Sequence, residues 1–227
     1  MQYKKTLNQV ERYFDQTATQ AWVALTSDAP VSGIRATVRA GRERMRSILL
    51  GQLPADLRGT RILDAGCGTG AMARELARRG AEVVAVDMAG SLIEVARAQS
   101  PDFLNIDYRC GDLTDSSLGQ FTHVVAMDSL IYYSSPELAL MLKALRARTQ
   151  HDIVFSLPPR TPLLMAMWRV GKLFPRGNRS PTMMPHSAEA VASALSEADV
   201  PGRLIAGERV SSGFYISSAY RQTKRNA

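Results

Sequence analysis

The chain has 227 residues, of which 45% are hydrophobic, and it carries a formal net charge of +7. This composition is typical of a globular protein of one domain with an appendage. No run reaches the roughly 18 apolar residues of a membrane span and the charged start lacks a signal-peptide apolar segment, so we expect a cytoplasmic protein. The two cysteines, Cys67 and Cys110, are expected to be reduced and to form neither a disulfide nor a metal site.

The positive charge favours anionic ligands, whether acidic lipid, nucleic acid or a polycarboxylate. The basic residues are spread along the chain without interleaved aromatic residues, so we do not expect a nucleic-acid partner.

The first 50 residues predict two helices, over 3–26 and 32–50, with a break at 27–30. Tyr13, Phe14 and Trp22 lie on the first of them and would give it an apolar surface. We interpret residues 1–50 as a helical arm that precedes a core at 51–227. The arm could cover a binding site or pack on the core as an extra layer, and the sequence leaves both open.

From residue 61 onward, short apolar runs alternate with helical patterns, which indicates βαβ units and a parallel sheet. The expected strands are 61–64, 82–87, 106–109, 122–128 and 151–156, and the expected helices between them are 70–79, 90–99 and 136–149. A helix at 187–198 and a hairpin of strands at 203–210 and 213–220 follow. The predicted fold class is α/β.

The segment 61–70 runs from an apolar strand through a glycine turn into a helix. Glycines let a ligand approach the backbone, and a helix start offers free N–H groups. This pattern predicts a cofactor loop. By itself it also satisfies the dinucleotide fingerprint, from Gly66 to Ala71, with Asp87 as the ribose-binding acid.

Acidic residues stand at or just after the ends of three successive strands: Asp64, Asp87 and Asp112. With the glycine spacing, they resemble the class I S-adenosylmethionine-dependent methyltransferases. The resemblance implies a Rossmann-like, seven-stranded, mostly parallel sheet with helices on both faces. It also implies S-adenosylmethionine as cofactor, with Asp87 on the ribose and Asp112 on the adenine. The expected cofactor-binding residues are Asp64, Gly66, Cys67, Gly68, Gly70, Asp87, Met88, Gly111, Asp112, Leu113 and Met127. An isolated aspartate after a strand is more commonly a turn or cap residue.

Residues 158–186 form an insertion rich in methionine and arginine. Adaptable methionines, a stacking tryptophan and arginines suit a large, flat, apolar ligand with carboxylates at its edge. A core-packed helix with a basic solvent face, or a short amphipathic helix on a membrane surface, remains open.

The stretches 10–22, 31–42, 124–133 and 171–181 resemble the magnesium-protoporphyrin IX O-methyltransferase family of chlorophyll and bacteriochlorophyll biosynthesis. The resemblance implies methyl transfer to a propionate carboxylate of the magnesium porphyrin, which gives the monomethyl ester. It also suggests the large subunit of magnesium chelatase as a partner and a peripheral position on the photosynthetic membrane. The expected substrate-binding residues are Tyr13, Trp22, Arg160, Trp168, Arg176, Arg179 and His186.

Three residues after the fourth strand, Asp128, Tyr132 and Tyr133, are expected at the methyl-transfer end. Plant and cyanobacterial members of the family have a histidine in place of Tyr132 and a tyrosine in place of Thr26. A carboxylate acceptor is already ionised at neutral pH, so it needs positioning more than a general base. Two competing hypotheses remain: a methyltransferase for a quinone precursor, and a non-catalytic porphyrin carrier.

Overall fold

The computed structural model describes residues 2–15, 33–161, 165 and 182–224. Four of the expected substrate-binding residues lie outside these ranges: Trp22, Trp168, Arg176 and Arg179. Thr26 also lies outside them, and the helix expected over 3–26 is described only to residue 15.

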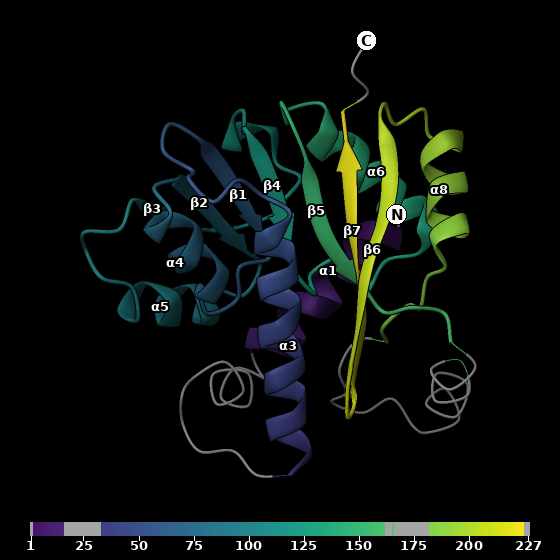
Figure 1. Ribbon diagram of the computed structural model, residues 1–227, viewed down its shortest axis with the longest axis horizontal. Coiled ribbons are helices and arrows are strands. Elements are labelled where there is room, and N and C mark those ends of the chain that lie inside the picture. The colour runs from purple at the N-terminus through teal and green to yellow at the C-terminus, as the bar shows by residue number, and fades with distance from the viewer. Residues whose placement is uncertain (1, 16–32, 162–164, 166–181, 225–227) are drawn as a thin grey trace.

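In the described residues, seven strands form one sheet in the order β3-β2-β1-β4-β5-β7-β6 (Figure 1). The neighbouring pairs from β3 to β5 are parallel, whereas β7 runs antiparallel to both β5 and β6. The predicted α/β class, with a mostly parallel sheet, is therefore confirmed. The strands are β1 (Arg61–Ala65), β2 (Glu82–Asp87), β3 (Ile106–Cys110), β4 (His123–Ala126), β5 (Ile153–Leu157), β6 (Arg203–Ser212) and β7 (Tyr215–Thr223).

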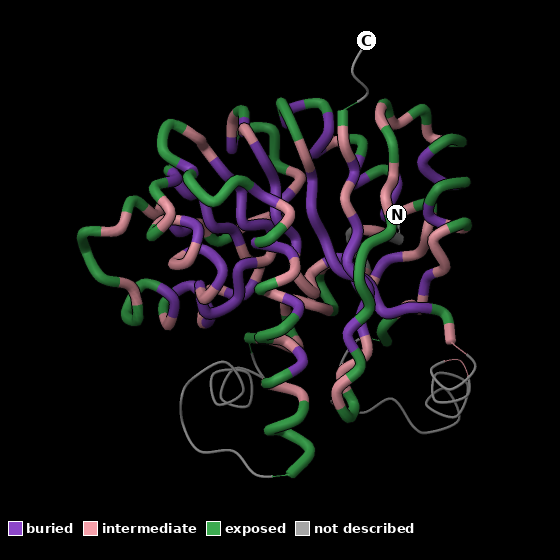
Figure 2. The backbone as a smooth tube through the Cα atoms, viewed as in Figure 1, coloured by how far each residue is buried: buried purple, intermediate pink, exposed green. Residues whose placement is uncertain are grey.

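Helices cover both faces of the sheet because successive strand side chains point to opposite sides. On one face, Leu63, Val84 and Phe155 belong to a core cluster with residues of α6 and α8. On the other, Ile62 and Val83 join residues of α3, α4 and α5. The buried centre of the molecule is visible in Figure 2. The helices are α1 (Gln2–Tyr13), α3 (Ile34–Gly51), α4 (Ala71–Arg78), α5 (Gly90–Ala98), α6 (Ser135–Arg146) and α8 (Ala188–Glu197), with a 3-10 turn η2 (Ser116–Leu118).

Helix α3 packs against β5, β6 and β7, and its N-terminal half extends past the ends of the parallel strands, beside the hairpin of β6 and β7 (Figure 1). Gly41 makes the close approach possible, because a Cβ there would lie 2.6 Å from Cδ1 of Tyr215. None of the helices in the described ranges is both long enough and apolar enough to cross a bilayer.

Two boundaries differ from the sequence prediction for identifiable reasons. Strand β4 ends at Ala126 rather than at 128, because Asp128 has a φ of 56° and leaves the extended conformation. Helix α6 begins at Ser135 because Ser134 and Glu137 form a capping box in front of Pro136.

Candidate active site

A cavity of about 560 Å³ lies where β1, β2 and β4 end and where α1, α3 and α4 meet the sheet. This size is within the range of small-molecule sites. Ligands of open α/β sheets bind beyond the carboxyl ends of the strands, which is the edge this cavity occupies. Nine of the predicted cofactor residues line it: Asp64, Gly66, Cys67, Gly68, Asp87, Met88, Gly111, Leu113 and Met127.

The glycine loop is held to β2 by backbone hydrogen bonds. The N–H groups of Gly66 and Cys67 both donate to the carbonyl of Val86, at 2.7 and 3.0 Å. Gly66 has a φ of 82°, and a Cβ there would lie 2.2 Å from Cβ of Ser129. A residue with a side chain would therefore be both strained and overpacked at this position. Gly70, also predicted to bind cofactor, is not a lining residue and stands before the start of α4.

Asp64 is buried at the end of β1 with 1% of its surface exposed. Within the described part of the chain, its Oδ2 has no hydrogen-bond partner. Burial raises the pKa of Asp64 to about 7, with the charge of Asp87 adding to the effect and Arg46 and Arg74 opposing it. A cationic group in the cavity would satisfy this oxygen and favour the ionised carboxylate.

Asp87 ends β2, and its carboxylate orders the loops on both sides of it. Oδ2 accepts from the N–H of Gly68 at 2.8 Å, and Oδ1 accepts from that of Ala89 at 3.0 Å. Burial raises its pKa despite these hydrogen bonds. Two carboxylate oxygens offer about four lone pairs, so each can still accept a hydrogen bond from a ligand hydroxyl.

Asp112 is held by hydrogen bonds from its neighbours, and its expected contact with the adenine stays a prediction. This residue is not among those that line the cavity, although its neighbours Gly111 and Leu113 are. Its Oδ1 accepts from the hydroxyl of Tyr3 in α1 and from the N–H and Oγ1 of Thr114, each at 2.8 Å. Burial raises the pKa of Tyr3, so its hydroxyl stays protonated and donates. Because Oδ1 of Asp112 already accepts these hydrogen bonds, a contact of Asp112 with the adenine would have to use Oδ2.

Aromatic side chains form the wall next to α1. Tyr132 and Tyr133 both line the cavity. The ring centroid of Tyr133 lies 5.5 Å from that of Tyr3, and Tyr132 meets Phe14 edge-on at 6.4 Å. The expected contact residue Tyr13 packs on Phe14 at 5.2 Å and is not a lining residue, whereas Phe14 is. The aromatic surface of the arm therefore reaches the cavity through Phe14, and the expected contact of Tyr13 with the substrate stays a prediction.

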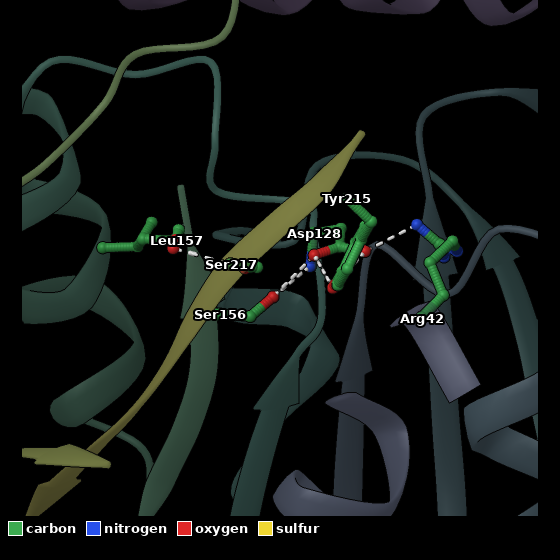
Figure 3. A network of polar contacts seen from close by, with 6 residues as sticks. All are labelled: Arg42, Asp128, Ser156, Leu157, Tyr215 and Ser217. Carbon is green, nitrogen blue, oxygen red and sulfur yellow. Dashed lines mark hydrogen bonds and ion pairs between the residues drawn. The ribbon is translucent and has the colours of Figure 1, made fainter. Parts of the chain in front are cut away.

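Asp128 lines the cavity but is the centre of a polar network (Figure 3). Its Oδ2 lies 2.6 Å from Nη1 of Arg42, and only 7% of the Asp128 side chain is exposed. Its Oδ1 accepts from Ser156 Oγ at 2.8 Å and from Tyr215 Oη at 3.0 Å. This carboxylate connects α3 with β5 and β7, and its expected place at the methyl-transfer end stays a prediction.

Two other predicted residues stand apart from the cavity. His186 is 3% exposed, and its Nδ1 lies 3.1 Å from Oγ of Ser135. Burial lowers its pKa, which favours the neutral imidazole. Arg160 is exposed, and its N–H donates to the carbonyl of His186 at 2.8 Å. Neither residue lines the cavity, so the structure does not place them as ligand contacts there.

Sequence reasoning missed a set of arginines that line the cavity from α3 and α4: Arg39, Arg42, Arg46, Arg74 and Arg78. A signal for the first three was present, because residues three or four apart share one face of a helix. Their position over the cavity depends on how α3 packs against β5 and β7, which their spacing does not reveal.

Comparisons with known proteins agree with this architecture. A family model described as "Methyltransferase domain" matches residues 62–152. A second, described as "Magnesium-protoporphyrin IX methyltransferase C-terminus", matches residues 126–224. The magnesium-protoporphyrin O-methyltransferase of Rhodobacter capsulatus is 50% identical over 218 residues, which is 95% of each chain. A ubiquinone biosynthesis O-methyltransferase of Xanthomonas oryzae is 34% identical over 54% of this chain and 55% of that protein.

The fold is shared with a crystal structure of magnesium protoporphyrin IX methyltransferase from Synechocystis with bound SAH. The TM-score is 0.80 at 23% identity, and the match covers 95% of this chain and 98% of that one. Sheet order, glycine loop and the methyltransferase model together define the fold of a class I methyltransferase. Within that class, the chain belongs to the magnesium-protoporphyrin O-methyltransferase family.

Proposed function

We propose that this protein transfers the methyl group of S-adenosylmethionine to a propionate carboxylate of magnesium protoporphyrin IX, giving the monomethyl ester in chlorophyll or bacteriochlorophyll biosynthesis. The observation that carries the proposal is 50% identity over 95% of the chain to a magnesium-protoporphyrin O-methyltransferase. The oxygen atoms of protoporphyrin IX belong to its two propionate groups, so O-methylation of this ring forms an ester. Arginines along the cavity complement such carboxylates.

The residues at the loop end of the cavity fit the cofactor. The unpartnered, buried Oδ2 of Asp64 suits the ammonium of the methionine part, and Arg46 and Arg74 nearby suit its carboxylate. The lone pairs left on Asp87 suit the vicinal ribose hydroxyls. Met88 and Leu113 supply apolar surface for the adenine.

The chemistry places modest demands on the protein. When bound, S-adenosylmethionine would supply a methyl group on a sulfonium, and the substrate carboxylate would take that methyl group while the electron pair of the broken C–S bond stays on sulfur. No proton moves, so the side chains have to hold the carboxylate in line and exclude water. Tyr132, which lines the cavity, would orient the carboxylate through its hydroxyl, and Tyr133 would pack behind it against Tyr3.

The arm at 1–50 and the insertion at 158–186 would complete the substrate site over the core at 51–227. Support for the arm comes from α1, since Leu7, Val10 and Phe14 line the cavity. The net charge of +7 supports contact with an anionic membrane surface, and a contact with the magnesium chelatase large subunit is a further proposal from the family resemblance.

A turnover assay tests the function. Purified protein with labelled S-adenosylmethionine is offered magnesium protoporphyrin IX, metal-free protoporphyrin IX and a quinone precursor in parallel. We expect label in an alkali-labile ester on the magnesium porphyrin. Label on the quinone precursor alone would instead support the quinone hypothesis, which has weaker support because that similarity spans 54% of the chain. Porphyrin binding without any transfer would support the carrier hypothesis.

A further inference from the structure

Helix α3 presents a row of arginines to the cavity: Arg39, Arg42 and Arg46. At a rise of 1.5 Å per residue, the row is about 10 Å long. Arg46 is at the cofactor end, because its charge opposes the rise in the pKa of Asp64. Arg42 is at the end of β4, where it contacts Asp128. The row therefore leads from the cofactor end of the cavity to the end of β4, where Arg42 meets Asp128.

We infer that Arg39 and Arg42 are the residues that bind the propionate carboxylates of the substrate and so select the free acid over its esters. This inference rests on the proposed function and names the groups that recognise the substrate. The insertion arginines that the sequence suggested for this role are either outside the described residues or, like Arg160, away from the cavity.

The local structure supports a carboxylate receptor. A guanidinium carries five N–H donors in a planar fork, so one arginine can donate to more than one acceptor at the same time. Asp128 is itself held by Ser156 and Tyr215, which fixes the direction of the Arg42 side chain before a ligand arrives. Only 17% of the Arg42 side chain is exposed, so its charge is less screened than that of a surface arginine.

Selection between acid and ester also follows from charge. Each methylation removes one negative charge from the porphyrin, so the monomethyl ester retains one carboxylate and the dimethyl ester none. Arginines on both carboxylates would bind the diacid most tightly and the dimethyl ester least tightly. The loss of one charge on turnover would then favour product release.

The test is a binding titration in which protein is added to magnesium protoporphyrin IX and, separately, to its dimethyl ester. The absorbance of the porphyrin reports binding. We expect Arg39→Ala and Arg42→Gln each to weaken binding of the diacid about 10-fold or more, on the scale of a charged hydrogen bond, and to leave binding of the dimethyl ester and of S-adenosylmethionine unchanged. Glutamine at position 42 keeps a hydrogen-bond donor for Asp128, and thermal melts would establish that both variants are folded.

Arg35→Ala is the matched control, because Arg35 is on the same helix, is exposed and does not line the cavity. It should change neither titration. Equal weakening of diacid and dimethyl ester, or unchanged binding of the diacid, would overturn the inference and leave the proposed function standing. A wild-type protein that binds S-adenosylmethionine but not the diacid would overturn both.

Discussion

Arg42 Nη1 lies 2.6 Å from Oδ2 of Asp128, although 86 residues separate the two in the chain. The pair joins the helix before the sheet to the loop after β4, and that loop carries Tyr132 and Tyr133. Because burial of a charge is costly unless the charge is paired, the pair ties the shape of the active site to the docking of α3.

The first prediction concerns the stability that this network provides. Asp128→Ala leaves Arg42 without this counter-ion and should lower the free energy of unfolding by about 3 kcal/mol, whereas Tyr215→Phe removes one hydrogen bond and should cost about 1 kcal/mol. Urea unfolding measures both. Arg44→Ala, which breaks an exposed ion pair with Glu208, is the control and should cost under about 1 kcal/mol. An Asp128→Ala cost no larger than that of the control would show that the network is not structural.

The second prediction is a pH dependence of stability without cofactor. The folded-state pKa of Asp64 is about 7, against 3.8 for the free side chain, so between these values the folded chain binds a proton that the unfolded chain has released. The free energy of unfolding should therefore fall as pH rises from about 4 to 7. Asp64→Asn should flatten this part of the profile, and Asp87, whose pKa is also raised, should account for some of the remaining slope. If the free energy of unfolding of Asp64→Asn fell with pH as steeply as that of the wild type, the raised pKa of Asp64 would not be the cause.

Cofactor binding should show the opposite trend with pH. The ammonium of S-adenosylmethionine favours the ionised form of Asp64, so affinity should rise as pH increases from 6 to 7.5, with release of a proton below pH 7. Calorimetry in two buffers of different ionisation enthalpy measures that proton. In Asp64→Asn the proton release from this residue should disappear, and the affinity should be weaker at every pH.

The third prediction is that Asp87→Ala loses turnover through the cofactor. Removal of a carboxylate that would accept two ribose hydroxyls should raise the Kd of S-adenosylmethionine about 10- to 100-fold. Equilibrium dialysis with labelled cofactor measures the change. Porphyrin binding should be retained, and Asp102→Ala, an exposed position after α5, should behave like wild type. Unchanged cofactor affinity in Asp87→Ala would refute the ribose assignment.

The fourth prediction separates positioning from base catalysis at Tyr132. Tyr132→Phe should lower kcat/KM for the porphyrin about 10-fold, whereas Tyr132→His, the residue of plant and cyanobacterial members, should keep most of the activity. The rate between pH 6 and 9 should not follow the titration of a base in any of these proteins, because the acceptor is already ionised. A pH profile in the histidine variant that follows an imidazole pKa would favour a base mechanism.

Local patterns in the sequence predict the order of strands and helices, the glycine loop, and the acids Asp64 and Asp87 at strand ends. These features depend on residues close together in the chain: apolar periodicity sets each element, and glycines permit the turn. The parallel sheet then brings the strand ends to one edge, so the cofactor half of the cavity follows from the sequence.

Contacts between residues far apart in the chain determine the other half of the cavity and the surroundings of several predicted site residues. Tyr3 reaches Asp112 across 109 positions, and Arg42 reaches Asp128 across 86. His186 is expected to bind substrate but is buried next to Ser135, and the arginines of α3, for which the sequence indicates no role, line the cavity. Periodicity identifies the faces of a helix, but only its packing decides which face meets a ligand, because that choice depends on shape complementarity between segments far apart in the chain.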